Sequence, residues 1–438
     1  MAGATQIKTP DKVRSLQIAL YRKAKAEPKY RFWSLYGELL RQDVLETALR
    51  IQLVNDGVAG VDGETLAAIN ATPQTRQEWL ARLQAELKTK TYRASPVRRV
   101  MIPKSGGGQR PLGIPTVKDR GVQTAVVLVL MPIFEADFHP HSYGFRPKRR
   151  AHQAIEAINQ AVRRGYVEII DADLSKYFDT IAHSTLMKRV AQRVSDGSLL
   201  RLIKSWLRAP VVEEDKDGTQ RVVPNRCGTP QGGVISPLLA NVYLNPLDHG
   251  VNDTTGGQAR MIRYADDFVI ACPPGRSAAV LTRLQRWLTA KGLKLNEAKT
   301  RVVNLREDGI NFLGFNLTWR QSRQGRGYLH REPSQKSRRA LRENLGQILN
   351  HWTLWRSAGA VVEETNRVLR GWAGYFHYRN RTSVMTRMRR YSQNRLWRWL
   401  WRKHDCQRAL GSYYSDQRLH EHYGLYALPI TAAWKASR

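Results

Sequence analysis

The chain has 438 residues, enough for two to four structural units, and 42% of them are hydrophobic, which excludes a basic tail without a core. Its 71 Lys and Arg outnumber 37 Asp and Glu and give a formal net charge of +34. A chain with this charge would repel itself unless it normally lies against a polyanion, and nucleic acid is the obvious partner.

The start of the chain and its cysteines indicate the compartment. The N-terminal segment M-A-G-A-T-Q-I-K-T-P-D-K-V-R-S has no apolar core of signal-peptide length, and the longest apolar stretch, near 125–134, is too short to span a bilayer. Cys227, Cys272 and Cys406 lie too far apart for a disulfide framework or a C-x-x-C zinc pair. We expect a protein of the reducing cytoplasm with no membrane partner.

Local patterns predict three kinds of region along the chain. Residues 10–90 are predicted to be mostly helical, with a loop at the glycine-rich segment N-D-G-V-A-G-V-D-G, 55–63. From about 95 to 317, short β-like runs alternate with amphipathic segments, as in a mixed α/β core. After about 325 the strands are expected to end and helical periodicity to take over. Two helical faces are predicted there: Leu341, Leu345, Ile348, Leu349 and Trp352, and then Val361, Thr365, Val368 and Trp372.

The segment E-I-I-D-A-D-L-S-K-Y-F-D, 168–179, begins as a strand whose period of two places Asp171 and Asp173 on one face. Either carboxylate could meet a second acidic site elsewhere in the core, and periodicity does not choose between them. The alternative makes Asp171 a surface charge and Asp179 a helix N-cap.

A second acidic site lies in M-I-R-Y-A-D-D-F-V-I, 261–270, which is predicted to form a hairpin with carboxylates at its tip. Adjacent carboxylates on such a turn repel each other, and a divalent cation would remove that repulsion. Phosphoryl transfer to a 3′-hydroxyl uses two metal ions about 4 Å apart, so carboxylates must converge from separate strands. The alternative is an ordinary solvated Asp-Asp turn.

Near the end of the chain, a basic helix is predicted from Arg381 to His404. On it an Arg/Asn stripe follows helical spacing, interleaved with three tryptophans: Arg387, Arg390, Asn394, Arg398 and Arg402, with Trp397, Trp399 and Trp401. Arginine with exposed aromatic rings suits a surface that follows phosphates and stacks on bases. The alternative is a solvated charged face.

Taken in order, these and other segments closely resemble the group II intron reverse transcriptases, the intron-encoded maturases of bacteria and organelles. The blocks that carry the resemblance run nearly from end to end of the chain: N-D-G-V-A-G-V-D-G at 55–63, I-P-K-S-G-G-G-Q-R-P-L-G-I-P at 102–115, H-S-Y-G-F-R-P at 141–147, D-L-S-K-Y-F-D-T-I at 173–181, G-T-P-Q-G-G-V-I-S-P-L-L-A-N-V-Y-L at 228–244, Y-A-D-D at 264–267, L-N-E-A-K-T at 295–300 and F-L-G-F at 312–315.

The resemblance implies an α+β fold: a right-hand polymerase, with fingers and palm built on antiparallel sheet, plus a helical thumb and maturase domain. It implies an N-terminal helical extension at 1–90 whose 55–63 insertion contacts template, and a fingers and palm core at 91–318. The thumb and maturase domain would occupy 319–404, and 405–438 would be a short DNA-binding segment. That last segment leaves no room for the His-Asn-His endonuclease of many relatives, so an endonuclease-lacking type in the bacterial cytoplasm is expected.

Carried over to this chain, the family's site assigns catalysis and metal binding to Asp173, Asp266 and Asp267, and adds Leu174 to the metal site. Phe178 occupies the position of an aromatic gate that would clash with a ribose 2′-hydroxyl. The nucleotide site would also contain Lys104 and Arg110, which match a basic pair that grips the triphosphate, and Pro230 and Gln231 of a tight P-Q-G turn, whose small residues would allow close approach to the base pair.

Two further surfaces follow from the resemblance. Phe312, Leu313 and Gly314 look like the primer grip, although core packing is an equal alternative for Phe312 and Phe315. The segment L-R-G-W-A-G-Y-F-H-Y, 369–378, resembles the maturase signature, and the RNA-binding surface would include Arg387, Arg390, Arg398 and Arg402.

The implied cofactor is two Mg²⁺ ions, with Mn²⁺ as the alternative. The implied partners are group II intron RNA, an RNA template with a DNA primer, target DNA and deoxynucleoside triphosphates, and binding through phosphates should fall steeply with salt. Three other functions fit parts of the pattern: a splicing cofactor that only binds RNA, a reverse transcriptase recruited to host defence or repair, and an RNA-dependent RNA polymerase, which Phe178 disfavours.

Overall fold

The structure is a computed structural model that describes residues 9–103, 108–214, 217, 219–378, 383–404 and 415–431. The chain divides into two compact units. The first consists mainly of Gly3–Ala157 and Ile170–Val302, and the second mainly of Ile158–Ile169 and Val303–Arg438. None of the helices within the described ranges is long and apolar enough to cross a membrane.

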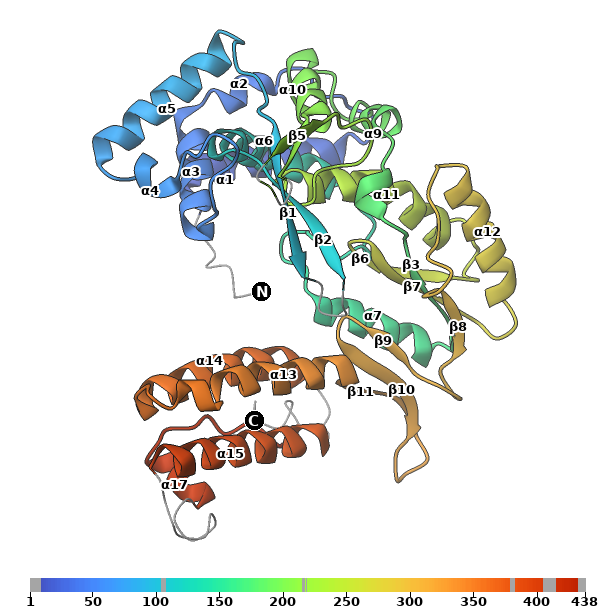
Figure 1. Ribbon diagram of the computed structural model, residues 1–438. Helices are drawn as coiled ribbons and strands as arrows, with labels where there is room; N and C mark the ends of the chain where they lie inside the picture. The colour runs from blue at the N-terminus through green and yellow to red at the C-terminus, as the bar shows by residue number, and fades with distance from the viewer. Residues whose placement is uncertain are drawn as a thin grey trace. The chain divides into compact units, whose positions relative to one another are not determined.

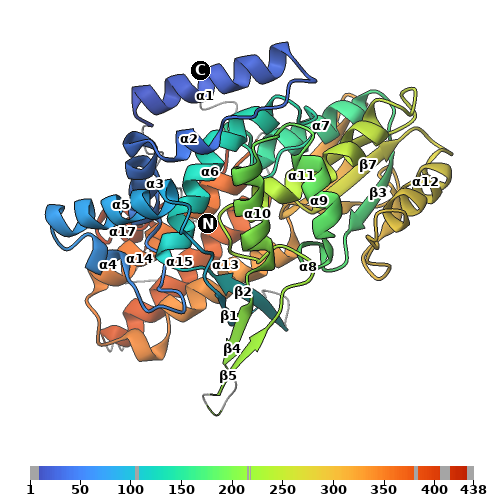
Figure 2. The same ribbon diagram turned by 90° about the horizontal axis from the view of Figure 1, so that it is seen from above.

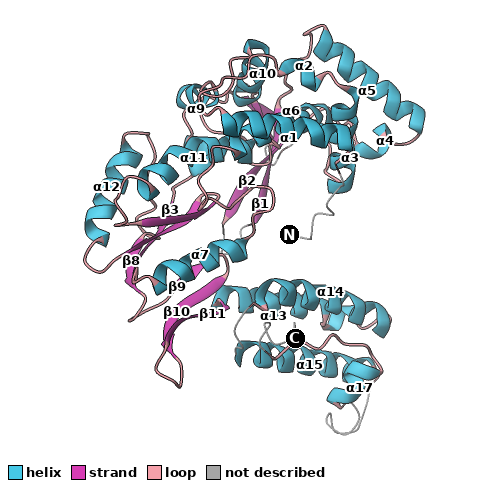
Figure 3. Cartoon of the chain, turned by 180° about the vertical axis from the view of Figure 1, so that it is seen from behind, coloured by secondary structure: helices cyan, strands magenta, loops and turns pink. Residues whose placement is uncertain are grey.

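The first unit begins with helices, as predicted for residues 10–90. They are α1 (Asp11–Ala26), α2 (Tyr36–Leu39), α3 (Gln42–Asn55), α4 (Leu66–Ile69) and α5 (Pro73–Lys88) (Figure 3). Helix α6 (Val117–Glu135) is mostly buried because α1, α2 and α3 pack on it. The predicted loop at 55–63 follows α3, and two arginines anchor it. Arg120 donates to the Val58 carbonyl at 2.8 Å, and Arg98 donates to the Ala59 carbonyl at 2.8 Å.

A four-stranded sheet with the order β2-β1-β4-β5 projects from these helices (Figure 2). It contains β1 (Val97–Pro103), β2 (Gln109–Ile114), β4 (Val211–Glu214) and β5 (Gln220–Val223). Strands β1 and β2 form an antiparallel hairpin, and β1 runs parallel to β4. This sheet brings two segments about a hundred residues apart to one place, because β1 pairs with β4. The P-Q-G turn, 230–232, follows β5 after a short loop.

A second sheet has the order β6-β7-β3-β8 and carries the predicted acidic residues. Its strands are β3 (Glu168–Asp173), β6 (Arg260–Tyr264), β7 (Asp267–Cys272) and β8 (Arg301–Asn304). Strand β7 is buried from Phe268 to Cys272, which explains its unbroken apolar sequence. Helix α7 (Ala151–Arg163) precedes β3 in the chain. The helices between these strands are α8 (Tyr177–Thr180), α9 (His183–Val190), α10 (Gly197–Arg208), α11 (Ser236–Asn252) and α12 (Ser277–Thr289).

The second unit combines a three-stranded sheet with a helical bundle. The sheet contains β9 (Ile310–Phe312), β10 (Phe315–Gln321) and β11 (Gly327–Pro333), and the helical segments are α13 (Gln335–Ile348), the short 3-10 helix η1 (His351–Thr353), α14 (Ala358–Phe376), α15 (Ser383–Lys403) and α17 (Asp416–Glu421). Helices α13, α14 and α15 lie side by side (Figure 1). Helix α15 agrees closely with the predicted helix at 381–404.

Two sequence predictions for this unit are wrong. Strands do not end near 325, because Gly327–Pro333 pairs along its whole length with β10. Its sequence G-Y-L-H-R-E-P has too few apolar residues to be recognised as a strand without its partner. Trp352 does not share the buried face of α13, which ends at Ile348; the Trp352 side chain is 81% exposed. The other four residues of that face are buried, as expected.

Candidate active site

The predicted acidic hairpin is present, with the carboxylates at its tip. Strands β6 and β7 pair in antiparallel register, and Tyr264 lies opposite Asp267. Ala265 and Asp266 therefore make a two-residue turn, in which Ala265 adopts a left-handed φ of 62°. Left-handed backbone costs free energy for a residue with a Cβ, so neighbouring groups must hold this turn.

Strand β3 lies next to β7 and brings both of its candidate carboxylates into electrostatic contact with the hairpin. Burial, followed by repulsion from Asp171, Asp266 and Asp173, raises the pKa of Asp267 to about 7. Burial also raises the pKa of Asp266 and of Asp171. Four like charges therefore share a partly buried site, which is an arrangement that favours a bound divalent cation with oxygen ligands.

The alternatives for Asp171 and Asp179 are wrong in detail. Asp171 is not an ordinary surface charge, because its side chain is 18% exposed and lies 3.5 Å from the Arg301 guanidinium. Asp179 is exposed but is not an N-cap, since α8 begins at Tyr177 and its N-cap residue is Lys176.

Lys299, from the L-N-E-A-K-T block, is a second cationic partner of this site, besides Arg301. Its ammonium group lies 2.8 Å from the Asp173 carboxylate, which also accepts from the Asn296 amide at 3.4 Å. Among the described residues, no three carboxylate, thiol or imidazole groups are already arranged to hold a metal ion. The carboxylate oxygens are nevertheless the ligands that Mg²⁺ and Mn²⁺ prefer, and Lys299 offsets part of the repulsion that such an ion would remove.

The raised pKa of Asp267 predicts how the stability of the metal-free protein depends on pH. A carboxyl that is harder to ionise in the folded state favours folding while it is protonated, and that contribution is lost as the pH rises from about 4 to about 7. We therefore expect the melting temperature of the wild type, measured with a chelator, to fall across this pH range. The melting temperature of Asp267→Asn should fall less. Thermal unfolding of both proteins at matched pH checks this. Parallel curves would contradict it.

A buried arginine holds the hairpin tip. Arg263 on β6 is completely buried and donates to the Ala265 carbonyl at 2.7 Å. It also donates to the Asn241 side chain at 2.8 Å and forms a two-pronged ion pair with Asp248, both on α11. The left-handed turn is thus tied to the core through one guanidinium. Sequence analysis missed this residue, although an Arg between Ile262 and Tyr264 inside a buried strand was a visible signal.

The H-S-Y-G-F-R-P block supports the same tip from another direction. The Tyr143 amide donates to the Arg263 carbonyl at 2.8 Å, and the Asn241 side chain donates to the Gly144 carbonyl at 2.8 Å. A Cβ on Gly144 would lie 2.2 Å from the Ala265 nitrogen. Glycine is therefore required here by close packing against the hairpin, a requirement that the sequence alone did not reveal.

Several predicted nucleotide-binding residues surround one cavity of about 320 Å³. Phe178, Pro230 and Gln231 line it, together with residues of the first sheet that include Pro111 and Gly113. Arg110 precedes Pro111 on β2, and its charge lowers the pKa of Asp266 against the larger effect of burial. Arg110 therefore acts electrostatically on the acidic hairpin from a strand that forms part of the cavity wall. Lys104 falls outside the described residues.

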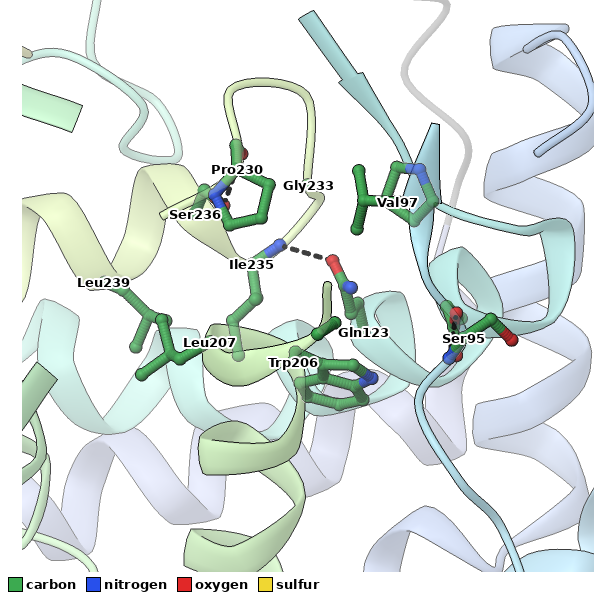
Figure 4. A pocket seen from close by; sticks show the side chains of 13 residues that line it. Ser95, Val97, Gln123, Trp206, Leu207, Pro230, Gly233, Ile235, Ser236 and Leu239 are labelled. Atoms are coloured by element: carbon green, nitrogen blue, oxygen red, sulfur yellow. Dashed lines mark hydrogen bonds between the residues drawn. The ribbon is translucent and has the colours of Figure 1, made fainter. Parts of the chain in front are cut away.

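The P-Q-G turn packs against strand β2, and the chain that follows it is hydrogen-bonded to Gln123 of α6 (Figure 4). The Gly113 amide donates to the Gln231 carbonyl at 2.5 Å, and a Cβ on Gly232 would lie 2.3 Å from the Gly113 carbonyl. Beneath the turn, the Ile235 amide donates to the Gln123 side chain at 3.3 Å. The small residues thus allow close approach of two backbone segments of the protein itself, a role that was not anticipated.

The predicted primer-grip segment lies in the second unit. Phe312 and Phe315 are completely buried, as the core alternative for them expected. Leu313 and Gly314 form the turn between β9 and β10 with positive φ values of 50° and 80°. The Tyr375 hydroxyl donates to the Leu313 carbonyl at 2.9 Å, so helix α14 fixes the shape of this turn.

The predicted basic stripe on α15 is exposed, but its aromatic partners are not. The five stripe residues, Arg387, Arg390, Asn394, Arg398 and Arg402, all face solvent. Trp399 is only 3% exposed, and Trp397 and Trp401 are partly buried against the core of the second unit. The expectation of exposed tryptophans on this helix is therefore wrong, because all three rings pack with the hydrophobic core of the second unit.

Two protein families match two separate parts of the chain. Residues 102–317 match the family described as "Reverse transcriptase (RNA-dependent DNA polymerase)", and residues 338–414 match "Group II intron, maturase-specific domain". The chain is similar to Protein YkfC of Escherichia coli (strain K12), with 34% identity over 352 residues that cover 72% of this chain and 90% of that protein.

Two further likenesses cover less of the relative or have low sequence identity. Group II intron-encoded protein LtrA of Lactococcus lactis subsp. cremoris is 35% identical over 220 residues, 50% of this chain and 35% of that protein, so the chain spans about a third of this relative. A telomerase structure from Candida albicans shares 13% identity over 80% of this chain and 68% of that chain, with a TM-score of 0.44, and supports no conclusion about this chain.

Proposed function

The chain belongs to the group II intron reverse transcriptases, RNA-directed DNA polymerases with a maturase-specific region, and from this we propose that it copies RNA into cDNA and binds group II intron RNA to promote splicing and mobility. One observation carries the polymerase proposal. The four mutually repelling carboxylates share one site, and Arg110, whose charge acts on Asp266, lies on a strand that lines a cavity of about 320 Å³ together with Phe178, Pro230 and Gln231.

The family implies catalysis with divalent metal ions, and Asp173, Asp266 and Asp267, with Leu174 beside Asp173, are the residues that we propose to hold two Mg²⁺ ions. Mn²⁺ is the alternative. When bound, such ions activate the primer 3′-hydroxyl and neutralise the leaving pyrophosphate. The chain would supply Arg110 and Lys104 as donors to the triphosphate, and no protein nucleophile is needed.

The remaining partners follow from this proposal. An RNA template with a DNA primer and deoxynucleoside triphosphates would occupy the polymerase site, with Phe312, Leu313 and Gly314 as the primer grip. Intron RNA would contact the exposed basic stripe that includes Arg387, Arg390, Arg398 and Arg402. Target DNA is proposed to contact 405–438, of which 405–414 and 432–438 lie outside the described residues.

The polymerase proposal is tested by extension of a DNA primer on an RNA template with magnesium and deoxynucleotides. Extension by the wild-type protein is expected. If a well-folded wild type bound RNA but did not extend the primer, the protein would act as an RNA-binding splicing cofactor instead.

Phe178 provides a sharper test of the nucleotide site. Its ring is partly buried, packs edge-on against Tyr177 and lines the cavity. If this ring excludes the ribose 2′-hydroxyl, Phe178→Ala should raise the efficiency of ribonucleotide relative to deoxynucleotide incorporation by about tenfold or more. The measurement is the ratio of the two kcat/KM values. Phe178→Tyr, which keeps the ring, is the matched control, and an unchanged ratio in Phe178→Ala would exclude the gate.

A further inference from the structure

Two tryptophans of the second unit are unusually exposed. Trp352 and Trp355 are 81% and 84% exposed, more than any other large hydrophobic side chain of the described residues. Both lie in the segment Asn350–Arg356 between α13 and α14, which we call the tryptophan turn. Tryptophan is rarely left in water without a use, because it exposes more apolar area than any other side chain.

The tryptophan turn is held firmly from within the bundle. The Trp399 indole donates to the Thr353 hydroxyl at 3.0 Å, and that hydroxyl donates to the Ile348 carbonyl at 2.8 Å. The Lys403 ammonium donates to the Leu354 carbonyl at 2.9 Å. The backbone that carries both exposed rings is therefore fixed, which lowers the entropy lost when a partner binds.

The surroundings of the two rings are positively charged. Helix α15 carries seven basic and no acidic residues, and no acidic residue occurs between Glu343 and Glu363. Arg395, Trp399 and Lys403 face the tryptophan turn or the helix end before it. Arg398 and Arg402 lie one position earlier on α15, about 100° around the helix, and both are exposed.

We propose that Trp352 and Trp355 form a stacking platform for unpaired bases of RNA, with Arg398 and Arg402 contacting the phosphates of the same strand. The inference rests on the proposed binding of intron RNA and specifies which part of that RNA is bound. Unpaired bases expose the flat faces that a tryptophan ring covers, whereas a duplex buries them. Glu364 is paired with Arg356 of the turn at 2.7 Å, and the basic residues of α15 leave the surroundings of the rings positive, which favours a polyanion over a protein partner.

The test compares binding of a labelled oligoadenylate RNA as a single strand and in a duplex with its complement, by fluorescence anisotropy at several salt concentrations. Trp352→Ala/Trp355→Ala should weaken single-strand binding by about tenfold or more, with little effect on the duplex. The salt dependence of RNA binding by this variant should equal that of the wild type, because no charge is removed. Arg398→Ala/Arg402→Ala should instead reduce the salt dependence.

Two controls separate the platform from other causes. Trp33→Ala removes another exposed tryptophan, 70% exposed and in the first unit, and should leave single-strand binding unchanged. Trp352→Phe/Trp355→Phe, which keeps an aromatic ring at both positions, should retain most of the single-strand affinity. Since both rings of the turn lie outside the core, the alanine variant should keep the wild-type melting temperature.

Other outcomes would overturn the platform. Wild-type affinity in the alanine variant, or an equal loss for the duplex, would show that the rings do not stack on unpaired bases. A wild-type dimer that the variant loses, seen by light scattering, would make the turn a protein interface. If the wild type itself bound no RNA, the proposed maturase function would fail as well, whereas primer extension tests the polymerase separately.

Discussion

Replacing Asp266 with alanine is expected to abolish primer extension, with a loss of about a thousandfold or more in kcat. Asp266 lies at the tip of the β6–β7 hairpin, where burial and Asp173 raise its pKa. A metal ion stabilises several kcal/mol of developing charge in phosphoryl transfer, and each ~1.4 kcal/mol is a factor of ten in rate. Extension on an RNA template with magnesium measures the loss directly.

The stability of the same variant distinguishes a lost ligand from a damaged fold. Removing one of four repelling carboxylates should leave the metal-free protein as stable as the wild type or more so. Magnesium should raise the melting temperature of the wild type more than that of Asp266→Ala. Asp11→Ala, which removes an exposed carboxylate at the start of α1, is the matched control and should extend primers normally. Extension by Asp266→Ala at the wild-type rate would refute the metal site.

Arg263→Met is expected to destabilise the protein by about 3–5 kcal/mol, because it leaves Asp248 buried without its partner. The Asn241 side chain and the Ala265 carbonyl would also lose a donor. Urea unfolding of the wild type and the variant measures this difference. A change of less than about 1 kcal/mol, typical of exposed ion pairs, would contradict the buried network.

A double variant separates the structural role of Arg263 from its role in positioning the hairpin. Arg263→Met/Asp248→Leu removes both buried charges and should recover much of the lost stability, since apolar replacement of a buried pair is often neutral. If Arg263 also positions the turn through the Ala265 carbonyl, kcat should stay low while the KM for deoxynucleotide changes little. Full recovery of kcat in the double variant would show that Arg263 stabilises the fold and does not position the hairpin.

The sequence by itself determined much of the fold. The β6–β7 hairpin, the helical N-terminal region, the loop at 55–63 and the basic face of α15 were all predicted, because each depends on periodicity or turn chemistry within one segment. The family and the α+β fold class are confirmed as well. The ordered motifs identified the family and the fold class, because a motif and its place in the series can be recognised without knowing which residues are in contact. The individual roles of the site residues remain predictions.

Only the tertiary structure decided which groups from distant segments meet. Lys299 pairs with Asp173 across 126 residues, and Gly144 packs against Ala265. Asp171 lies with the other carboxylates instead of in solvent. Among the described residues of the second unit, the exposed tryptophans are those of the tryptophan turn instead of those of α15. Burial and long-range pairing depend on how the elements pack against one another. The period of one helix or strand shows which residues share a face, but it does not show whether that face meets water or a neighbouring element.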